Sequence, residues 1–482
     1  MKINIKAYLF ILFLFGCFTL IGQYQFPFRI DNYAGMQAGI FNPAATLTQI
    51  PKWEVDLVSG GLFIDNNIAY LQNTSTLSLL SNKPNLKPAT TITSEKPINS
   101  GDLIYDFFYN NNKKYIIQNA YVGLPGFVMQ IGNNQRIGFF SNIRQAFSGT
   151  QFPFTLDYYH FDQTPNYIKI PSDNFTVTGM AWTEIGAHYA ISREHSSGIE
   201  GIGINLKYLL GHEGFYFRNE TPTFITQLPN DSFKLDHIQL SYAMTTSNLD
   251  TKQKNAIKIN GQGVALDLGY TYTIEGNDGY DWKFLVGLND LGWVTFNRNA
   301  EKHQLNSVDS FFINQNKYTD SLNIISKSRL LSTDILGNPL ASLTGQSFSI
   351  GTPARLNFMV DYKLMPHIYL AAVGVFDLPL AHRKINMGNM FSLIPRFESK
   401  WLSASLPVSY FQGKNVNLGL NIRLGFLTIG TTNLLSIINN SEHYTGTDFY
   451  FALQLHSLSF GDGEYTIKSK KISRKKVKCY KF

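Results

Sequence analysis

Residues 261–296 read GQGVALDLGYTYTIEGNDGYDWKFLVGLNDLGWVTF, and this stretch decides the fold. Between Val264 and Ile274 every even position is apolar and every odd position is small or polar. A period of two is typical of a β-strand whose two faces meet different surroundings. The turn at 276–279 offers the left-handed backbone conformations that tight hairpins need, and the apolar alternation resumes at Tyr280. The stretch is therefore predicted to form a β-hairpin.

The length and chemistry of the two arms fit a hairpin that crosses a membrane. Each arm has about a dozen residues, and a tilted strand needs roughly 9–11 residues to cross a bilayer. The apolar face is nearly free of charge, as hydrocarbon requires, because a Lys or Arg at the bilayer midplane costs roughly 2–4 kcal/mol. The other face carries mainly small and uncharged polar residues, unlike the charged outer face of a soluble sheet. The same alternation recurs at 202–210 and 416–424.

Runs of this kind alternate with turns and polar segments along most of the 482 residues. Aromatic content is high at 14%, and barrels of outer membranes place aromatic residues as girdles at both interfaces. About fourteen to sixteen strands can be counted. We predict an all-β fold, a single transmembrane antiparallel β-barrel of about 14 strands with a short N-terminal plug-like segment. Polar loops are expected at 80–115, 155–174 and 298–345, and no helical period of useful length competes.

The N-terminus has the pattern of a secretory signal peptide. Lys2 and Lys6 precede an apolar run over 7–21, and cleavage is expected after Gly22, so that residues 1–22 are the signal peptide. A lipobox-like Leu-Phe-Gly before Cys17 leaves lipidation of that cysteine as the alternative.

The rest of the chain divides into three parts. Residues 23–51 are expected to enter the barrel lumen, 52–460 to form the barrel, and 461–482 to form a basic tail. The net charge of +7 lies at the ends, because residues 466–482 hold eight basic residues and no acid and the signal holds two basic residues, which leaves about −3 for 23–465. Since the barrel itself is slightly acidic, nucleic-acid binding is not expected despite a pI near 9.0.

Four short motifs carry a family resemblance: Asn32-Tyr33-Ala34-Gly35, Asn42-Pro43-Ala44, Asp267-Leu268-Gly269 and Asp290-Leu291-Gly292-Trp293. With them the chain resembles an outer-membrane β-barrel family of unknown function from Bacteroidota. That family is distantly similar to the long-chain fatty-acid transporter barrels, which also carry an Asn-Pro-Ala near the N-terminus. The resemblance covers most of residues 24–460 and implies a location in the cell outer membrane.

The motif Asn42, Pro43 and Ala44 has two interpretations. The resemblance to the transporters implies a segment that plugs or gates the lumen. Local chemistry predicts instead a structural turn, in which Asn caps the backbone and Pro fixes φ before the first strand.

Four further residues lie on the polar faces of predicted strands and are candidates to face the lumen: Glu184, His188, Asp267 and Arg423. Asp290 is in register with the lipid-facing residues of its strand. A β-bulge near Asn289 or Gly292, or a strand end at the interface, would resolve this conflict.

The sequence gives no catalytic, cofactor or metal-binding motif. Its ten His are scattered, with no HExxH, no GxSxG and no glycine-rich phosphate loop, so neither an enzyme nor a cofactor is expected. The expected function is passage of a small or hydrophobic molecule across the outer membrane. The alternative is a non-transporting barrel that serves as scaffold or partner in an envelope or secretion complex. Expected partners are outer-membrane lipid and other envelope proteins, with the cargo unassigned.

Overall fold

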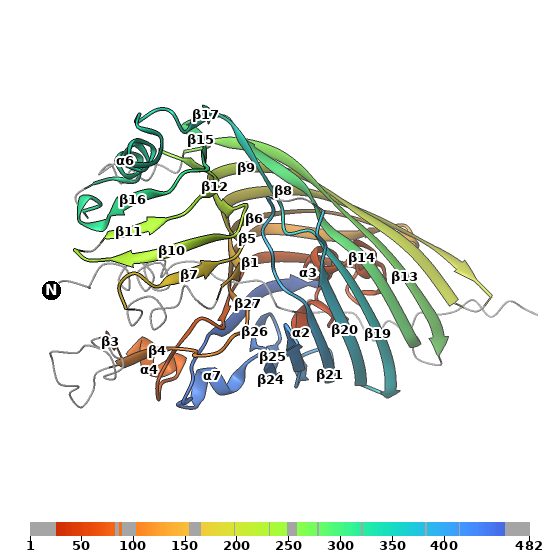
Figure 1. Ribbon diagram of the computed structural model, residues 1–482. Helices are drawn as coiled ribbons and strands as arrows, with labels where there is room; N and C mark the ends of the chain where they lie inside the picture. The colour runs from red at the N-terminus through yellow and green to blue at the C-terminus, as the bar shows by residue number, and fades with distance from the viewer. Residues whose placement is uncertain are drawn as a thin grey trace, which may run out of the picture.

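The computed structural model describes residues 26–81, 86–88, 103–153, 165–196, 198–230, 232–247, 258–276, 279–319, 322–380, 383–413 and 415–457. Within these residues, antiparallel strands close into a 14-stranded barrel (Figure 1). Tight turns join strands at one end of the barrel, the short-turn end, and mostly longer segments join them at the other, the long-loop end. The predicted fold class, a barrel of about fourteen strands with an N-terminal plug-like segment, is confirmed.

The wall strands follow one another round the barrel in chain order. β1 closes the ring, because it pairs with β5 on one side and with β27 on the other. Two places in the ring are each filled by two short strands, β22 with β23 and β24 with β25, which are interrupted at the same level by Pro407 and Gly419. The wall strands are β1 (Trp53–Asn66), β5 (Lys114–Ile131), β6 (Gln135–Phe152), β8 (Phe175–His195), β9 (Gly198–Asn219), β13 (Gly261–Gly276), β14 (Gly279–Phe296), β19 (Arg355–Met365), β20 (Ile368–Asp377), β21 (Met390–Glu398), β22 (Leu402–Ser405), β23 (Val408–Phe411), β24 (Asn415–Leu418), β25 (Leu420–Leu424), β26 (Leu427–Thr431) and β27 (Thr447–His456).

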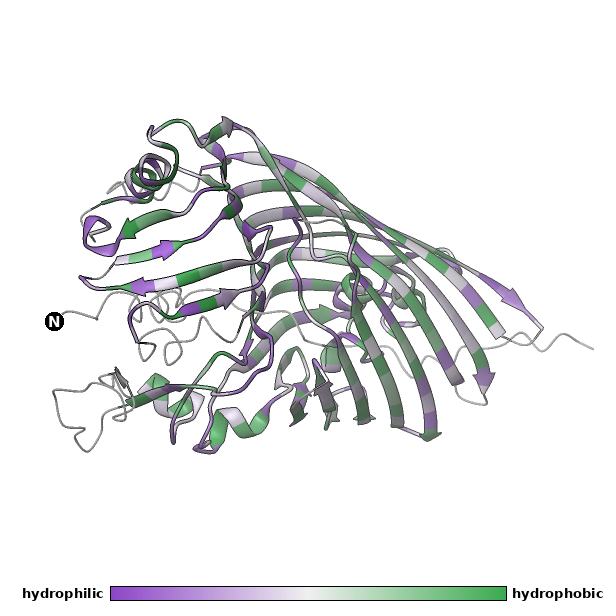
Figure 2. Ribbon diagram, in the orientation of Figure 1, coloured by the Kyte–Doolittle hydropathy of each residue, from purple (hydrophilic) through white to green (hydrophobic). Residues whose placement is uncertain are grey.

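The alternation in the sequence becomes the two faces of this wall. In β13, Val264 and Tyr270 are 53% and 42% exposed on the outside, whereas Ala265 and Asp267 point inward and are buried. Figure 2 shows the same alternation of apolar and polar bands along neighbouring strands. Because the ring is closed, no wall strand presents an open edge of unpaired backbone groups.

The first described residues, 26–51, lie inside the barrel and are called the plug. The plug contains α2 (Phe26–Arg29), α3 (Met36–Phe41) and the 3-10 helix η1 (Pro43–Thr48). Every residue from Phe26 to Thr46 is buried. η1 contacts β8, β9 and β13, while α2 contacts β25 and β26 on the opposite side of the ring. The plug therefore reaches across the lumen from one wall to the other (Figure 1).

Four further strands prolong the sheet at the long-loop end, and two small sheets stand beside it (Figure 1). The prolonging strands are β12 (Ile238–Thr245), β15 (Ala300–Ser307), β17 (Leu343–Gly345) and β18 (Phe348–Gly351). The rim sheet is formed by β7 (Lys169–Ser172), β10 (Thr223–Leu228), β11 (Ser232–Leu235) and β16 (Phe311–Asn314). The second sheet is formed by β2 (Ala69–Leu71), β3 (Leu86–Pro88) and β4 (Leu103–Phe107), with α4 (Thr76–Ser81) and α7 (Leu434–Ile438) nearby.

The prediction that 298–345 is a polar loop without helix is wrong. The segment holds three strands, the short 3-10 helix η3 (Gln315–Lys317) and the 13-residue helix α6 (Ile324–Leu336). Asn323 caps α6 by accepting from the Ser326 N–H at 2.7 Å, and Gly337 ends it with φ +76°. Its apolar face is narrow and packs on Leu235, Phe311 and their neighbours. Contact with the rim sheet stabilises this helix. Its apolar residues show only a weak helical periodicity in the sequence, and for that reason the sequence did not predict it.

The polar segment 80–115 likewise contains β3 and β4. In the ranges that the structure describes, no helix has both the length and the apolarity needed to cross a membrane. The predicted signal peptide (1–22), the predicted basic tail (461–482) and the predicted barrel end at 460 lie outside the described residues.

Candidate functional site

A β-bulge in the 261–296 hairpin turns Asp290 inward. Leu266 of β13 pairs with Leu291 of β14, and Leu268 pairs with Leu288, so Asp267 alone opposes two residues. Asp290 has φ +56°, in the left-handed region, and is buried. This is the β-bulge near Asn289 predicted from the sequence as one way to resolve the register of Asp290, and the extra residue changes the phase of the strand so that Asp290 points inward.

The bulge completes a cluster of six charged side chains inside the barrel, called the central ion cluster. Arg144 donates to Glu184 at 2.9 Å and to both carboxylate oxygens of Asp290 at 3.0 Å. Lys207 lies 2.8 Å from Asp267 and 2.7 Å from Asp290. Three cations and three carboxylates balance in charge, as burial requires. The members are Arg144, Glu184, Lys207, Asp267, Asp290 and Arg355.

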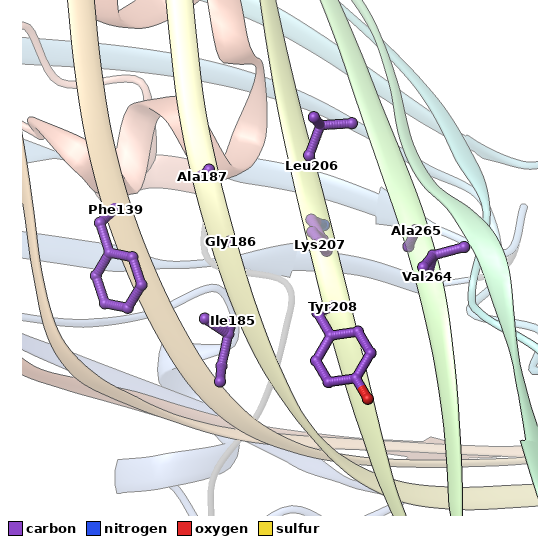
Figure 3. Close-up of a pocket in the computed structure, with 9 residues that line it drawn as sticks. All are labelled: Phe139, Ile185, Gly186, Ala187, Leu206, Lys207, Tyr208, Val264 and Ala265. Carbon is purple, nitrogen blue, oxygen red and sulfur yellow. The ribbon is translucent and has the colours of Figure 1, made fainter.

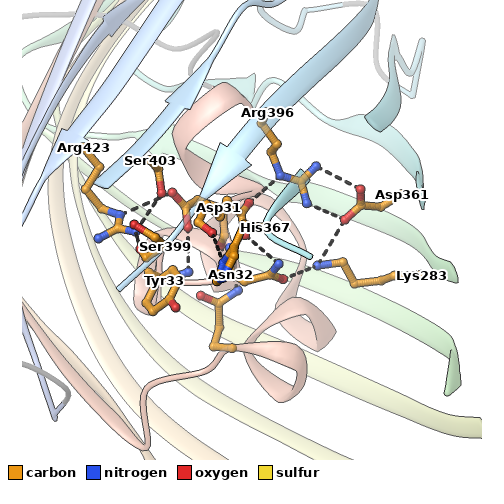
Figure 4. A network of polar contacts seen from close by, with 12 residues as sticks. Asp31, Asn32, Tyr33, Lys283, Asp361, His367, Arg396, Ser399, Ser403 and Arg423 are labelled. Atoms are coloured by element: carbon orange, nitrogen blue, oxygen red, sulfur yellow. Dashed lines mark hydrogen bonds and ion pairs between the residues drawn. The ribbon is translucent and has the colours of Figure 1, made fainter. Parts of the chain in front are cut away.

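A second ion cluster lies nearer the short-turn end and binds the plug directly (Figure 4). Arg396 donates to Asp361 through both terminal nitrogens, at 2.9 and 2.5 Å. Lys283 donates to Asn32 Oδ1 at 2.8 Å, and Asn32 Nδ2 donates to Glu398 at 2.7 Å. One amide of the plug is thus held between a cation and an anion of the wall.

Arg423, a predicted lumen-facing residue, holds the neighbouring plug residues (Figure 4). Its Nε lies 3.3 Å from Asp31 Oδ2, and its guanidinium lies 4.4 Å from the centre of the Tyr33 ring. It also donates to the carbonyl of Ser399 at 2.7 Å, in the turn after β21. Arg423 therefore links the plug to the wall near a short turn.

Three wall asparagines bind three successive carbonyls at the end of α3. Asn205 of β9 donates to Gly39 O at 2.9 Å. Asn289 of β14 donates to Ile40 O at 3.0 Å, and Asn357 of β19 donates to Phe41 O at 2.9 Å. The last carbonyls of a helix have no partner within it, and burial without partners would destabilise it. These asparagines supply those partners from the wall.

Carboxylates of β1 bind the other end of α3. Glu54 accepts from the Met36 N–H at 2.8 Å, and Asp56 accepts from the side chain of Gln37. An anion at a helix N-terminus satisfies a free N–H and complements the helix dipole. Both termini of a six-residue helix are thus satisfied by the barrel, which explains how so short a helix is ordered in the lumen.

The Asn42, Pro43 and Ala44 turn is packed against backbone of the wall. Asn42 Oδ1 accepts from the Ala44 N–H at 2.9 Å and caps η1, while Pro43 occupies the first turn. A methyl group on Gly203 would lie 2.5 Å from Ala44 N, and one on Gly269 would lie 2.7 Å from it. Only glycine at these two wall positions leaves room for the turn.

His188 and Glu184 lie on one inward face of β8 but have separate partners. His188 bonds Thr46 of the plug at 3.0 Å and Asn205 at 2.7 Å. Glu184 belongs to the central ion cluster and also accepts from Asn142 at 2.7 Å. Among the described residues, no group of three or more His, Cys, Asp or Glu is arranged to hold a metal ion.

Inward side chains become apolar toward the long-loop end. On β8 and β9 the polar residues at the level of the plug give way to Met180, Trp182, Leu209 and Tyr216, all buried. These side chains belong to one continuous apolar cluster with side chains of other wall strands and of the plug, called the apolar layer. Other members include Phe26, Phe41, Phe63, Ile117, Val294, Phe296, Phe348, Ile350, Ile385, Met387, Met390 and Phe411.

The outer wall carries a shallow apolar groove of about 340 Å³ across β6, β8, β9 and β13 (Figure 3). Phe139, Ile185, Leu206 and Tyr208 project around the small Ala187. The groove lies on the outward face, separate from the plug and the ion clusters.

The sequence did not identify most residues that hold the plug. Asn205 and Lys207 could be placed on the polar face of 202–210, and alternation was the signal for them. The matching of Asn205, Asn289 and Asn357 to consecutive carbonyls depends on strand stagger, which alternation does not encode.

Several solved structures resemble the chain at low similarity. The TodX deltaS2S3 mutant monoaromatic hydrocarbon channel is 8% identical, with 88% of this chain and 94% of that chain covered and a TM-score of 0.37. A Pseudomonas aeruginosa FadL homologue is 11% identical, with 87% and 91% covered and a TM-score of 0.27. The translocator domain of autotransporter NalP from Neisseria meningitidis is 8% identical, with 84% and 88% covered and a TM-score of 0.29. Similarity at this level says nothing about what the barrel does.

No protein with a curated description matches the chain. A match to a protein family covers residues 52–432, from the start of β1 to the end of β26, and so includes most of the wall. The chain belongs to this family, which is described as a family of unknown function (DUF5723).

Proposed function

We propose that the protein is an outer-membrane β-barrel that passes a small hydrophobic molecule through its lumen, with the plug as the closure. The outward face supports this location, because Leu206, Val264 and Val416 are 59%, 53% and 70% exposed. Such a wall is unfavourable in water and stable in hydrocarbon. By the usual orientation of bacterial barrels, the long-loop end faces the outside and the short-turn end the periplasm.

The apolar layer is the observation that carries the proposal for the cargo. A channel for ions or sugars has a polar lumen. Here the space between the long-loop end and the plug is filled by buried aromatic and aliphatic side chains of the wall and the plug. An apolar molecule that enters from the outside would meet this layer before it meets the plug.

Two polar atoms inside the apolar layer favour a cargo with some polar character. Within the described residues, Trp182 Nε1 and Tyr216 Oη are buried and make no hydrogen bond. A few polar groups in an otherwise apolar site are typical of small-molecule binding sites. Burying them without a partner costs roughly 1–3 kcal/mol each, which a bound cargo would offset.

An uptake assay tests the proposal. Cells that carry the protein in a lipopolysaccharide-containing outer membrane should take up an apolar fluorescent dye several-fold faster than cells without it. Leu209→Asn should lower the rate, since it places an amide in the apolar layer, whereas Val308→Asn on the exposed rim should not. Heat-modifiable migration on gels verifies that each variant is folded. Equal uptake with and without the protein would refute passage of this class of molecule.

The plug also supports the alternative, a non-transporting barrel that serves as a scaffold in an envelope complex. It is bonded to opposite sides of the wall, through Arg423 on one side and Asn205 on the other. Planar-bilayer recordings separate the two functions. If the plug closes a pore, the intact protein should conduct no steady current, and deletion of residues 26–51 should produce a clear current. If the protein is a scaffold, it should not increase dye uptake, and substitutions in the rim should abolish partner binding.

A further inference from the structure

Two short helices at the long-loop end have their polarity reversed. In α7 (Leu434–Ile438) the only buried residue is Ser436, and none of its four aliphatic residues is buried. In α4 (Thr76–Ser81) no residue is buried, although three of its six residues are leucine. The outermost side chains are more than half exposed, at 54% for Leu77, 66% for Leu80 and 57% for Ile438. A water-exposed helix normally has the opposite arrangement.

Hydrogen bonds between polar groups fill the side of these helices that faces the protein. Thr76 Oγ1 donates to the Ser436 carbonyl at 3.1 Å and lies within hydrogen-bond distance of the Thr447 hydroxyl, at 2.9 Å. Asn433 caps α7 by accepting from the Ser436 N–H at 3.2 Å. The two helices contact each other, so their aliphatic residues form one patch. This patch, Leu77, Leu80, Leu435 and Ile438, is called the α4–α7 patch.

The patch lies beside the apolar outer wall. α7 contacts β24, whose Val416 is among the most exposed apolar residues of the wall. Figure 1 places α7 next to β24 at the long-loop end, with α4 beside β4, and Figure 2 shows α7 as largely hydrophobic. The rim helix α6 differs, because its Leu331 and Ile335 pack against the rim sheet.

We infer that the α4–α7 patch lies in the hydrocarbon boundary of the outer leaflet and contacts lipid acyl chains. The inference rests on the proposed membrane location and adds a contact surface above the strands. Burial of the exposed aliphatic side chains in hydrocarbon removes apolar area from water, which is favourable at about 25 cal/mol per Å². On insertion, Thr76 and Ser436 on the inner side keep their hydrogen bonds within the protein.

Spin labels test this placement in the full chain, in a background with Cys17→Ser and Cys479→Ser. Labels at Leu80→Cys and Ile438→Cys are compared with Val416→Cys on the wall and Val308→Cys on the rim, in dioleoylphosphatidylcholine vesicles. A high collision rate between the spin label and oxygen indicates that the label lies in lipid. A high collision rate with a water-soluble nickel chelate indicates that it lies in water. Heat-modifiable migration verifies folding. The oxygen-to-nickel ratio at both patch positions should match Val416→Cys and exceed Val308→Cys several-fold.

A ratio equal to that at Val308→Cys would place the patch in water and overturn the inference, while Val416→Cys still reports lipid. Protection from both reagents would also overturn it, because protein and not lipid would then cover the patch. If Val416→Cys itself reports water, the proposed membrane location fails, and the inference fails with it.

Discussion

The backbone N–H of Asp290 donates to Oδ1 of Asp267 at 2.7 Å, across the bulge where one residue of β13 opposes two of β14. The bond joins the two Asp-Leu-Gly motifs of the hairpin. It orients both carboxylates inward, where Lys207 lies within 2.8 Å of each. The central ion cluster therefore depends on the bulge, and the bulge depends on the side chain of Asp267.

Replacing Asp267 should separate its two roles. Asp267→Ala removes the acceptor for the Asp290 N–H and a charge that faces Lys207, so it should lower the free energy of unfolding by about 3–5 kcal/mol. Asp267→Asn retains an acceptor oxygen and should cost about 1–3 kcal/mol. Urea unfolding of the refolded protein in vesicles, followed by tryptophan fluorescence, measures both. Asp309→Ala on the exposed rim is the control and should change little. Equal losses of unfolding free energy in Asp267→Ala and Asp267→Asn would mean that the hydrogen bond from the Asp290 N–H contributes nothing to stability.

Loss of the three wall asparagines should loosen the plug without opening the wall. Each of Asn205→Ala, Asn289→Ala and Asn357→Ala removes one hydrogen bond to a carbonyl of α3, worth about 1 kcal/mol net. The triple variant should therefore exchange the amide hydrogens of residues 36–48 markedly faster, as hydrogen-exchange mass spectrometry would detect. Asn323→Ala removes the N-cap of α6 and should affect only that helix. Unchanged exchange in the plug of the triple variant would contradict this account.

A methyl group on a wall glycine should displace the Asn-Pro-Ala turn. Gly203→Ala and Gly269→Ala would each bring a carbon within 2.7 Å of Ala44 N, with backbone on both sides and little freedom to move. Overpacking of this kind costs about 1–3 kcal/mol. Gly345→Ala is a matched control, since nothing lies within 4 Å of its added carbon. Proteolysis of the plug and the urea midpoint should change for the first two variants and not for the third.

The rim sheet should weaken in acid through Asp236. Hydrogen bonds from Lys169 and Lys234 lower the pKa of Asp236 to about 2. Because the folded pKa lies below the unfolded value of about 3.9, the stabilisation is complete above that value and is lost as pH falls toward 2. Hydrogen exchange in β10 and β11, corrected for the intrinsic pH dependence, should therefore accelerate between about pH 4 and 2. Asp236→Asn should lack this step, and a step of equal size in that variant would assign it to other groups.

The wall and its two faces could be predicted because they depend on local pattern. Val264 to Ile274 alternates with a period of two, and a strand places such residues on opposite faces whatever surrounds it. The apolar side of 416–424 is recognisable for the same reason. The inward position of Asp267, Glu184, His188 and Arg423 also follows from that geometry.

The contacts of those inward residues could not be predicted. Asn205 and Gly39 are 166 residues apart, and Arg423 and Asp31 are 392 apart, so their meeting depends on stagger and closure of the whole ring. Asp290 points inward because β14 has one extra residue at the bulge. Only the pairing of β13 with β14 defines where that residue lies. The helices α3 and α6 have little periodicity of their own and are ordered by bonds and packing from other elements.

The sequence by itself determined that this chain forms a closed β-barrel with an apolar outside, because alternation and turn chemistry act between near neighbours. Only the tertiary structure decided how the lumen is filled. Buried amides, carboxylates and cations must find partners, and those partners come from strands far apart in the chain that ring closure brings within about 3 Å.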